Sequence, residues 1–134
     1  MRRIALLVAS ALLLPLPAAA QGVCQKTCTV VITMSAGCGS GIKVAPDPLF
    51  VAPGADVEIS FTIQSEGWSF DDNGIAILLA TEEDFAKGAS SSKSRKFKHK
   101  NKGKKVFKYD VNLVDQRPGT QGQKCKLDPN IVDQ

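Results

Sequence analysis

Residues 57–63 read Val57-Glu58-Ile59-Ser60-Phe61-Thr62-Ile63, and they decide the fold class. Apolar and polar side chains alternate with a period of two, which is typical of a β-strand that buries one face and exposes the other. Residues 107–113 repeat the pattern, with an apolar side chain at every odd-numbered position. These two segments predict a protein that is built from half-buried strands.

Shorter strand-like segments lie on both sides of residues 57–63. They are rich in β-branched and apolar residues, and turn-forming glycine, proline, asparagine or aspartate separates them. These predicted strands cover residues 29–34, 42–44, 49–51 and 75–79, the last of them continuous enough to be buried on both faces. Many short strands separated by turns are typical of a sandwich or barrel, and we predict an all-β Greek-key β-sandwich.

One segment has a helical pattern. Thr81 can cap a first helical turn, and the acids of residues 82–84 suit the positive end of a helix. We therefore predict one short helix over residues 81–87, docked on the sheets by Phe85. Trp68 is expected to pack into the core or its rim, because tryptophan buries a large area.

The order of these segments resembles the opening of cupredoxin-like domains. Ile42-Lys43-Val44 is followed by a turn at Pro46, and Leu49-Phe50-Val51 by a turn at Pro53-Gly54 that leads into the strand from Val57. Phe107-Lys108-Tyr109-Asp110-Val111 resembles the penultimate strand of the same fold. The resemblance spans about residues 28–132 and implies a cupredoxin-like topology. Within that group the chain resembles small exported bacterial proteins with a comparable ending, residues 125–132, and no established activity.

This chain departs from cupredoxins at the residues that would hold copper. A type 1 copper site uses two histidines, a thiolate cysteine and a weak axial ligand such as methionine. The chain has one histidine, His99, and neither histidine nor methionine follows Cys125. We expect no metal site and no cofactor. The alternative prediction is a periplasmic copper-handling protein that uses a non-standard site on the cupredoxin scaffold, with Met34 as its thioether.

Residues 1–20 are predicted to be a secretory signal peptide. Two arginines precede an apolar run from Ile4 to Leu14, and Ala18-Ala19-Ala20 supplies small residues for cleavage. The run is too short to cross a bilayer, which takes about 20 residues. Residues 21–134 are then expected to form a single disulfide-stabilised domain that is periplasmic or secreted.

Four cysteines remain in that domain: Cys24, Cys28, Cys38 and Cys125. An even number of cysteines in an exported chain favours two disulfides over a metal site, and the sequence leaves all three pairings open. Because three of the four lie near one end of the domain, we expect a bridge that staples the N-terminal region to the C-terminal strand.

The strongest candidate for function is a run of positive charge. The segment 93–108 holds nine lysines and arginines and no acid, whereas eight of the thirteen acids lie in the segment 56–84. Without Arg2 and Arg3 the net charge falls from +4 to +2, which conceals this separation of charge. The basic residues are Lys93, Arg95, Lys96, Lys98, Lys100, Lys102, Lys104, Lys105 and Lys108.

We predict that residues 93–108 form a two-stranded hairpin that turns at Asn101-Lys102-Gly103 and presents these charges as a strip. Outside the cytoplasm the expected partners of such a strip are polyanions: an anionic polymer, the phosphates of a membrane surface or an acidic protein. The competing interpretation is that the lysines only keep an exposed edge soluble.

No catalytic residues are predicted. His99 lies among lysines, and no serine has the surroundings of a hydrolase nucleophile. Residues 37–41 are rich in glycine, but the Lys-Ser/Thr of a phosphate-binding loop does not follow them. The sequence therefore predicts a non-enzymatic binding or structural module that contacts polyanions through the basic hairpin.

Overall fold

The computed structural model describes residues 22–35, 37–38, 41–120 and 122–134, and the predicted signal peptide lies outside them. The described residues form ten strands. In chain order they are β1 (Thr27–Met34), β2 (Ile42–Ala45), β3 (Leu49–Val51), β4 (Asp56–Ile63), β5 (Trp68–Ile77), β6 (Phe85–Ser90), β7 (Ser94–Lys100), β8 (Lys105–Asp115), β9 (Lys124–Leu127) and β10 (Asn130–Asp133).

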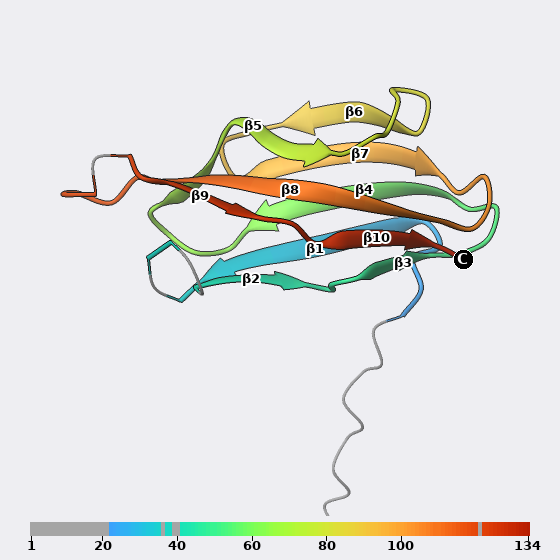
Figure 1. The fold of residues 1–134 in the computed structure, drawn as a ribbon, viewed down its shortest axis with the longest axis horizontal. Coiled ribbons are helices and arrows are strands. Elements are labelled where there is room, and N and C mark those ends of the chain that lie inside the picture. The colour runs from blue at the N-terminus through green and yellow to red at the C-terminus, as the bar shows by residue number, and fades with distance from the viewer. Residues whose placement is uncertain (1–21, 36, 39–40, 121) are drawn as a thin grey trace, which may run out of the picture.

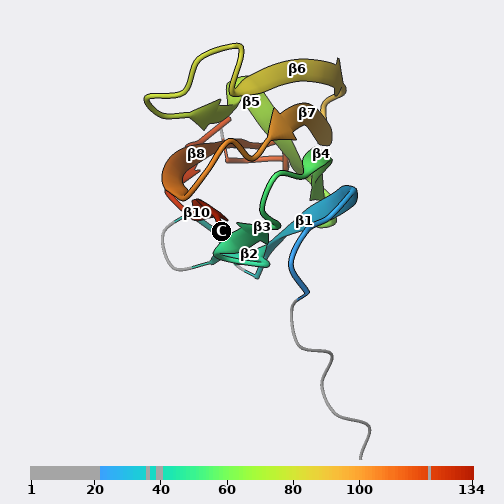
Figure 2. The same ribbon diagram turned by 90° about the vertical axis from the view of Figure 1, so that its right-hand side faces the viewer.

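The strands form two sheets that face each other (Figure 1, Figure 2). The first sheet has the order β2-β1-β4-β7-β6 and the second the order β3-β10-β8-β5, with β9 paired to β8. Pairs are antiparallel except for β1 with β4 and β3 with β10, which are parallel. The prediction of an all-β sandwich is confirmed at this level.

The predicted alternation places the core between the sheets. In β4 the apolar side chains at odd-numbered positions are buried, and Phe61 is completely so. The Phe61 ring lies 5.9 Å from that of Phe97 in its own sheet and 5.1 Å from that of Tyr109 in the other sheet. Trp68 at the start of β5 is also buried, as expected from its size.

Tyr109 carries an unpaired polar group into this core. Its side chain is completely buried, and among the described residues its hydroxyl is the one buried side-chain polar atom without a hydrogen-bond partner. Burial raises the pKa of this hydroxyl, so it stays neutral. A buried hydroxyl without a partner costs free energy relative to the same ring without it.

Tyr109→Phe is therefore expected to raise the free energy of unfolding by about 1 kcal/mol. Urea denaturation followed by the fluorescence of Trp68 measures this change. A loss of stability would contradict the expectation, and would mean that the hydroxyl has a partner such as a buried water.

The predicted short helix over residues 81–87 is wrong: the described residues contain no helix. Thr81 and Asp84 do exchange the hydrogen bonds of a cap, since the Thr81 N–H donates to Asp84 Oδ2 at 3.0 Å and the Asp84 N–H donates to Thr81 Oγ1 at 3.3 Å. These bonds close only a turn. After this turn the chain continues as strand β6, because Phe85 is buried against β7 and stacks on His99 with ring centroids 4.0 Å apart.

The strand predicted over residues 75–79 begins and ends earlier than expected. β5 starts at Trp68 and ends at Ile77, with an irregularity in its pairing to β8 between Phe70 and Ile75. Leu78 and Leu79 were expected to be buried and are exposed instead. Leu79 is completely exposed and has a φ of 56°, in the left-handed region that a leucine rarely occupies.

The two expected disulfides are confirmed, and the structure decides their pairing: Cys24 with Cys28, and Cys38 with Cys125. The second bridge joins the β1–β2 connection to β9, so it is the expected staple between distant parts of the chain. Two disulfides in a small domain are typical of proteins from oxidising compartments outside the cytosol. The described residues contain no helix that is long and apolar enough to cross a membrane.

Candidate functional site

The predicted two-stranded hairpin over residues 93–108 is wrong. β7 lies between β4 and β6 in the first sheet, whereas β8 lies between β10 and β5 in the second. Residues 101–104 therefore cross from one sheet to the other, at the end of the sandwich where the label C lies (Figure 1). The physical reason is burial, because His99 and Phe107 on either side of this crossing both point into the space between the sheets.

Asn101 fixes the backbone of the crossing. Its side chain is buried, and its amide nitrogen donates to the carbonyl oxygens of Val51 at 3.1 Å, Ala52 at 3.0 Å and Gln134 at 3.0 Å. Its amide oxygen accepts the N–H of Gly103 at 2.9 Å. The sequence pattern identified Asn101 only as a turn residue, whereas it joins three segments of the chain.

Four of the nine basic residues make contacts within the fold: Lys105, whose ammonium lies 4.6 Å from the centre of the Phe107 ring, and three residues at or just before the start of β7. The Lys93 ammonium donates to a backbone carbonyl of the β4–β5 connection at 2.8 Å. The Arg95 guanidinium donates to carbonyls at the start of β7 and in the connection before it, and lies 4.9 Å from the centre of the Phe70 ring. Lys96 lies 3.5 Å from the carboxylate of Glu58. These three side chains therefore support the sandwich.

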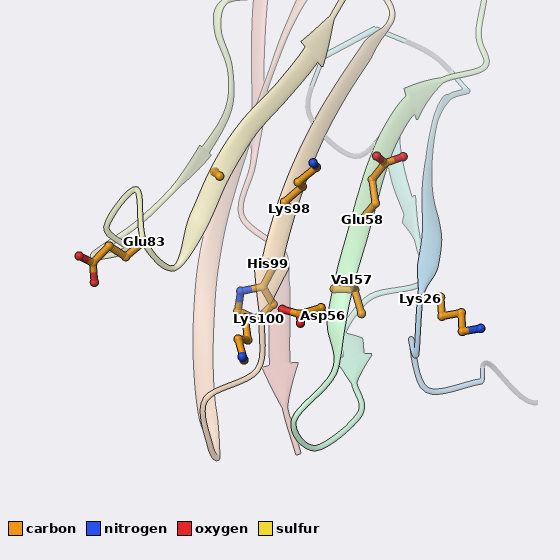
Figure 3. A pocket seen from close by; sticks show the side chains of 9 residues that line it. Lys26, Asp56, Val57, Glu58, Glu83, Lys98, His99 and Lys100 are labelled. Carbon is orange, nitrogen blue, oxygen red and sulfur yellow. The ribbon is translucent and has the colours of Figure 1, made fainter.

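Lys98 and Lys100 face acids on the neighbouring strand. The register of β4 and β7 pairs Glu58 with Lys98 and Asp56 with Lys100. Figure 3 shows these side chains around a cavity of about 480 Å³. Its charged lining consists of Lys26, Lys98, Lys100, Asp56, Glu58 and Glu83. The three lysines balance the three acids, and His99, which also lines the cavity, is paired with Asp133, so this cavity has no net attraction for an anion.

With Lys105, the three basic residues that remain form a group that we call the crossover lysines: Lys102, Lys104, Lys105 and Lys108. They lie on the β7–β8 crossing and the first residues of β8, and all four are exposed. Within the described part of the chain, none of their ammonium groups has a carboxylate within 4.0 Å. Lys105 lies opposite Asp133 in the register of β8 and β10, but the Asp133 carboxylate is bound to His99. The positive surface is thus smaller than the predicted strip and lies at one end of the sandwich.

The crossover lysines affect the pKa of Asp84, which lies in the β5–β6 connection. Hydrogen bonding from the backbone of Thr81 is the main reason why the pKa of Asp84 is held below its ordinary value. The hydroxyl of Thr81 and the positive charges of Lys105 and Lys102 lower this pKa further. The Asp84 carboxylate therefore reports on the electric field at this end of the molecule.

His99 was expected among the lysines of a hairpin, but it lies in the core. Its Nε2 is 2.8 Å from Oδ1 of Asp133 on β10, and its Nδ1 is 2.7 Å from the carbonyl oxygen of Asp84. Both ring nitrogens are thus within hydrogen-bond distance of a protein oxygen, which holds the ring from two sides. The alternation of β7 could have predicted this burial, because His99 shares a face with Phe97. Asp133 gave no signal in the sequence.

The residues of the alternative copper site have other roles in the structure. All four cysteines are in disulfides, so none offers a thiolate. Both nitrogens of His99 are occupied by protein acceptors. Over residues 22–35, 37–38, 41–120 and 122–134, no group of three or more His, Cys, Asp or Glu side chains is arranged to hold a metal ion.

No family model and no curated protein matches the chain. Among solved structures, the chain is similar to a cysteine protease inhibitor from Entamoeba histolytica, with 13% sequence identity and a TM-score of 0.38. The match covers 81% of this chain and 97% of the inhibitor. It is a distant likeness between two β-rich chains and identifies no ligand. The cupredoxin-like resemblance stays a prediction from the order of the strands.

Proposed function

We propose that the protein is a non-enzymatic binding module that holds a polyanion on the crossover lysines. One observation carries the proposal: these four exposed lysines form no ion pair within the described residues, whereas Lys96 contacts Glu58, and Lys98 and Lys100 lie opposite acids of β4. The buried amide of Asn101 holds the backbone beneath them, so the charges project from a fixed part of the molecule.

The chemistry of lysine favours a polymer over a single small anion. An ammonium group is a strongly hydrated point charge on a flexible stem, and each contact with an exposed phosphate or sulfate is weak. Binding becomes measurable when several lysines neutralise several linked anions and release their counterions. Lys98 and Lys100 contribute less in this proposal, because Glu58 and Asp56 lie opposite them.

A comparison of two triple variants tests the proposal. Both replace three exposed lysines by glutamine and change the net charge equally. The site variant is Lys102→Gln/Lys104→Gln/Lys108→Gln, and the control is Lys26→Gln/Lys43→Gln/Lys87→Gln. The site variant is expected to elute from heparin at clearly lower salt than the wild type, with the control close to the wild type. On random duplex DNA, the slope of log affinity against log salt should fall by about three for the site variant.

Two results would count against the proposal. Equal losses in both triple variants would mean that only the total charge matters. Unchanged retention of the site variant, together with poorer solubility, would favour the interpretation that these lysines keep the protein soluble.

Asp84 supplies a second, local readout of the same binding. A bound polyanion offsets the field of Lys105 and Lys102, so the pKa of Asp84 is expected to rise towards its ordinary value when a heparin fragment is added. An NMR titration of the side-chain carboxyl measures this shift. The hydrogen bonds from Thr81 persist in the complex, so the pKa should stay below the ordinary value.

We also propose that the sandwich has Greek-key topology and that the protein is exported to the periplasm or secreted. Support for the topology comes from the strand neighbours β4 with β7 and β5 with β8, each three strands apart in the sequence. The strand neighbours in β4-β7-β6 and β10-β8-β5 correspond to the neighbours B-E-D and G-F-C of immunoglobulin-type sandwiches. A Greek-key sandwich agrees with the cupredoxin-like resemblance of the sequence, and such a sandwich does not require a copper site.

A further inference from the structure

An apolar row crosses three strands on the outer face of the second sheet. The register pairs Val132 of β10 with Phe50 of β3 on one side and with Val106 of β8 on the other. The residues before and after Phe50 and Val132, and Phe107 after Val106, are buried in the core. Alternation along each strand therefore turns this row outward, and Val106 is 61% exposed.

Two exposed leucines lie beside this row. The Leu78 N–H donates to the carbonyl oxygen of Lys108 at 2.9 Å, which ties the β5–β6 connection to β8 two residues from Val106. Leu78 is 41% exposed and Leu79 completely exposed. Figure 2 shows this connection projecting from the edge of the sandwich between β5 and β6. A completely exposed leucine in the left-handed region is costly in conformational energy, and such strain is often found at functional loops.

Lysines lie along the border of this apolar row. Lys104 and Lys105 line a shallow groove of about 510 Å³ together with Val106, Val132, Gln134 and Asp133, whose carboxylate is bound to His99. Lys108 follows Val106 on the same outer face, next to Leu78. Aliphatic side chains and ammonium groups thus form one continuous surface. This combination fits the boundary between the headgroups and the acyl chains of a bilayer with anionic lipids.

We infer that this surface docks on an anionic lipid bilayer, an inference that rests on the proposed function and names its ligand. Lys104 and Lys108 contact headgroup phosphates while Val106 and Leu79 enter the interface. A soluble polyanion would contact the lysines and gain nothing from the exposed aliphatic side chains. A second copy of this chain on the same face would bring Lys104 and Lys108 against their own counterparts, and like charges oppose such a contact.

Vesicle flotation with the disulfide-bonded protein tests the inference. The wild type is expected to float with vesicles of phosphatidylglycerol mixed into phosphatidylcholine, and not with phosphatidylcholine alone. Lys104→Gln/Lys108→Gln should weaken binding about fivefold for each lysine. Val106→Ser should weaken it about fivefold and leave retention on heparin unchanged. Val114→Ser is the matched control, because Val114 lies on the same face at the far end of β8.

Leu79→Asn separates docking from folding. Asparagine tolerates the left-handed region better than leucine does, so this variant should be at least as stable as the wild type and still bind vesicles several-fold more weakly. A loss of binding in this variant therefore does not come from unfolding.

The outcomes distinguish the two proposals. Retention on heparin that depends on the crossover lysines, without vesicle binding or with equal binding of Val106→Ser and wild type, would overturn the lipid inference. The ligand would then be a soluble polyanion, and the proposed function would stand. Failure to bind both heparin and anionic vesicles would overturn both.

Discussion

Replacing Cys38 and Cys125 together by alanine is expected to lower the free energy of unfolding by about 4–5 kcal/mol, against about 2 kcal/mol for the matched pair Cys24 and Cys28. The reason is the length of the loop that each bridge closes. Cys38 and Cys125 are 87 positions apart and Cys24 and Cys28 only 4, so the first bridge removes far more freedom from the unfolded chain. Guanidinium denaturation of the two double variants, followed by circular dichroism, measures both losses.

Each double variant controls for the other, since both remove one bridge and both truncate two cysteine side chains to alanine. Equal losses would contradict the expectation and would mean that the unfolded chain is already compact, so that loop length matters little. The m-value of each transition checks this, because residual structure in the unfolded chain lowers it.

The second large effect is expected at the buried pair of His99 and Asp133. Asp133→Leu should cost about 3–5 kcal/mol, because it leaves His99 with a donor that faces no acceptor in the core. The double variant His99→Phe/Asp133→Leu should recover most of this loss, since phenylalanine keeps the stacking on Phe85 and an apolar pair needs no hydrogen bonds. Urea denaturation of the single and double variants gives the coupling energy.

Additive losses in that cycle would contradict the pairing, because independent residues have no coupling energy. The single variant His99→Phe completes the cycle. It leaves the Asp133 carboxylate buried without a partner, and it too should be strongly destabilising.

The sequence allowed the strands around residues 57–63 and 107–113 to be predicted, because burial of one face leaves a local pattern with a period of two. Which strands pair is not local information. A turn signal between two strands looks the same whether the strands form a hairpin or belong to different sheets, and the contacts that decide between these come from residues far away. At Asn101 they come from Val51, Ala52 and Gln134.

The same limit applies to the candidate site. The nine basic residues of the run could be found by counting charge, but the partners of Lys96, Lys98 and Lys100 lie on β4, which the sequence places in a separate acidic segment. Only the pairing of β4 with β7 shows that the charges of these lysines are largely balanced by acids.

The prediction of a helix over residues 81–87 was wrong for a similar reason. A cap between Thr81 and Asp84 is compatible with a helix or with a single turn, and the burial of Phe85 favours the turn.

The bonds of Asn101 have a consequence for the order in which the molecule assembles. The crossing that carries the lysines is held by carbonyls at the end of β3 and just after β10, and β3 reaches β10 only through a parallel pairing of distant segments. Such non-local contacts form late in folding, because closing the long loop costs entropy before any contact is gained. A chain in which β10 has not yet paired therefore lacks the finished surface, and the lysines acquire their fixed spacing only after β10 has joined the second sheet.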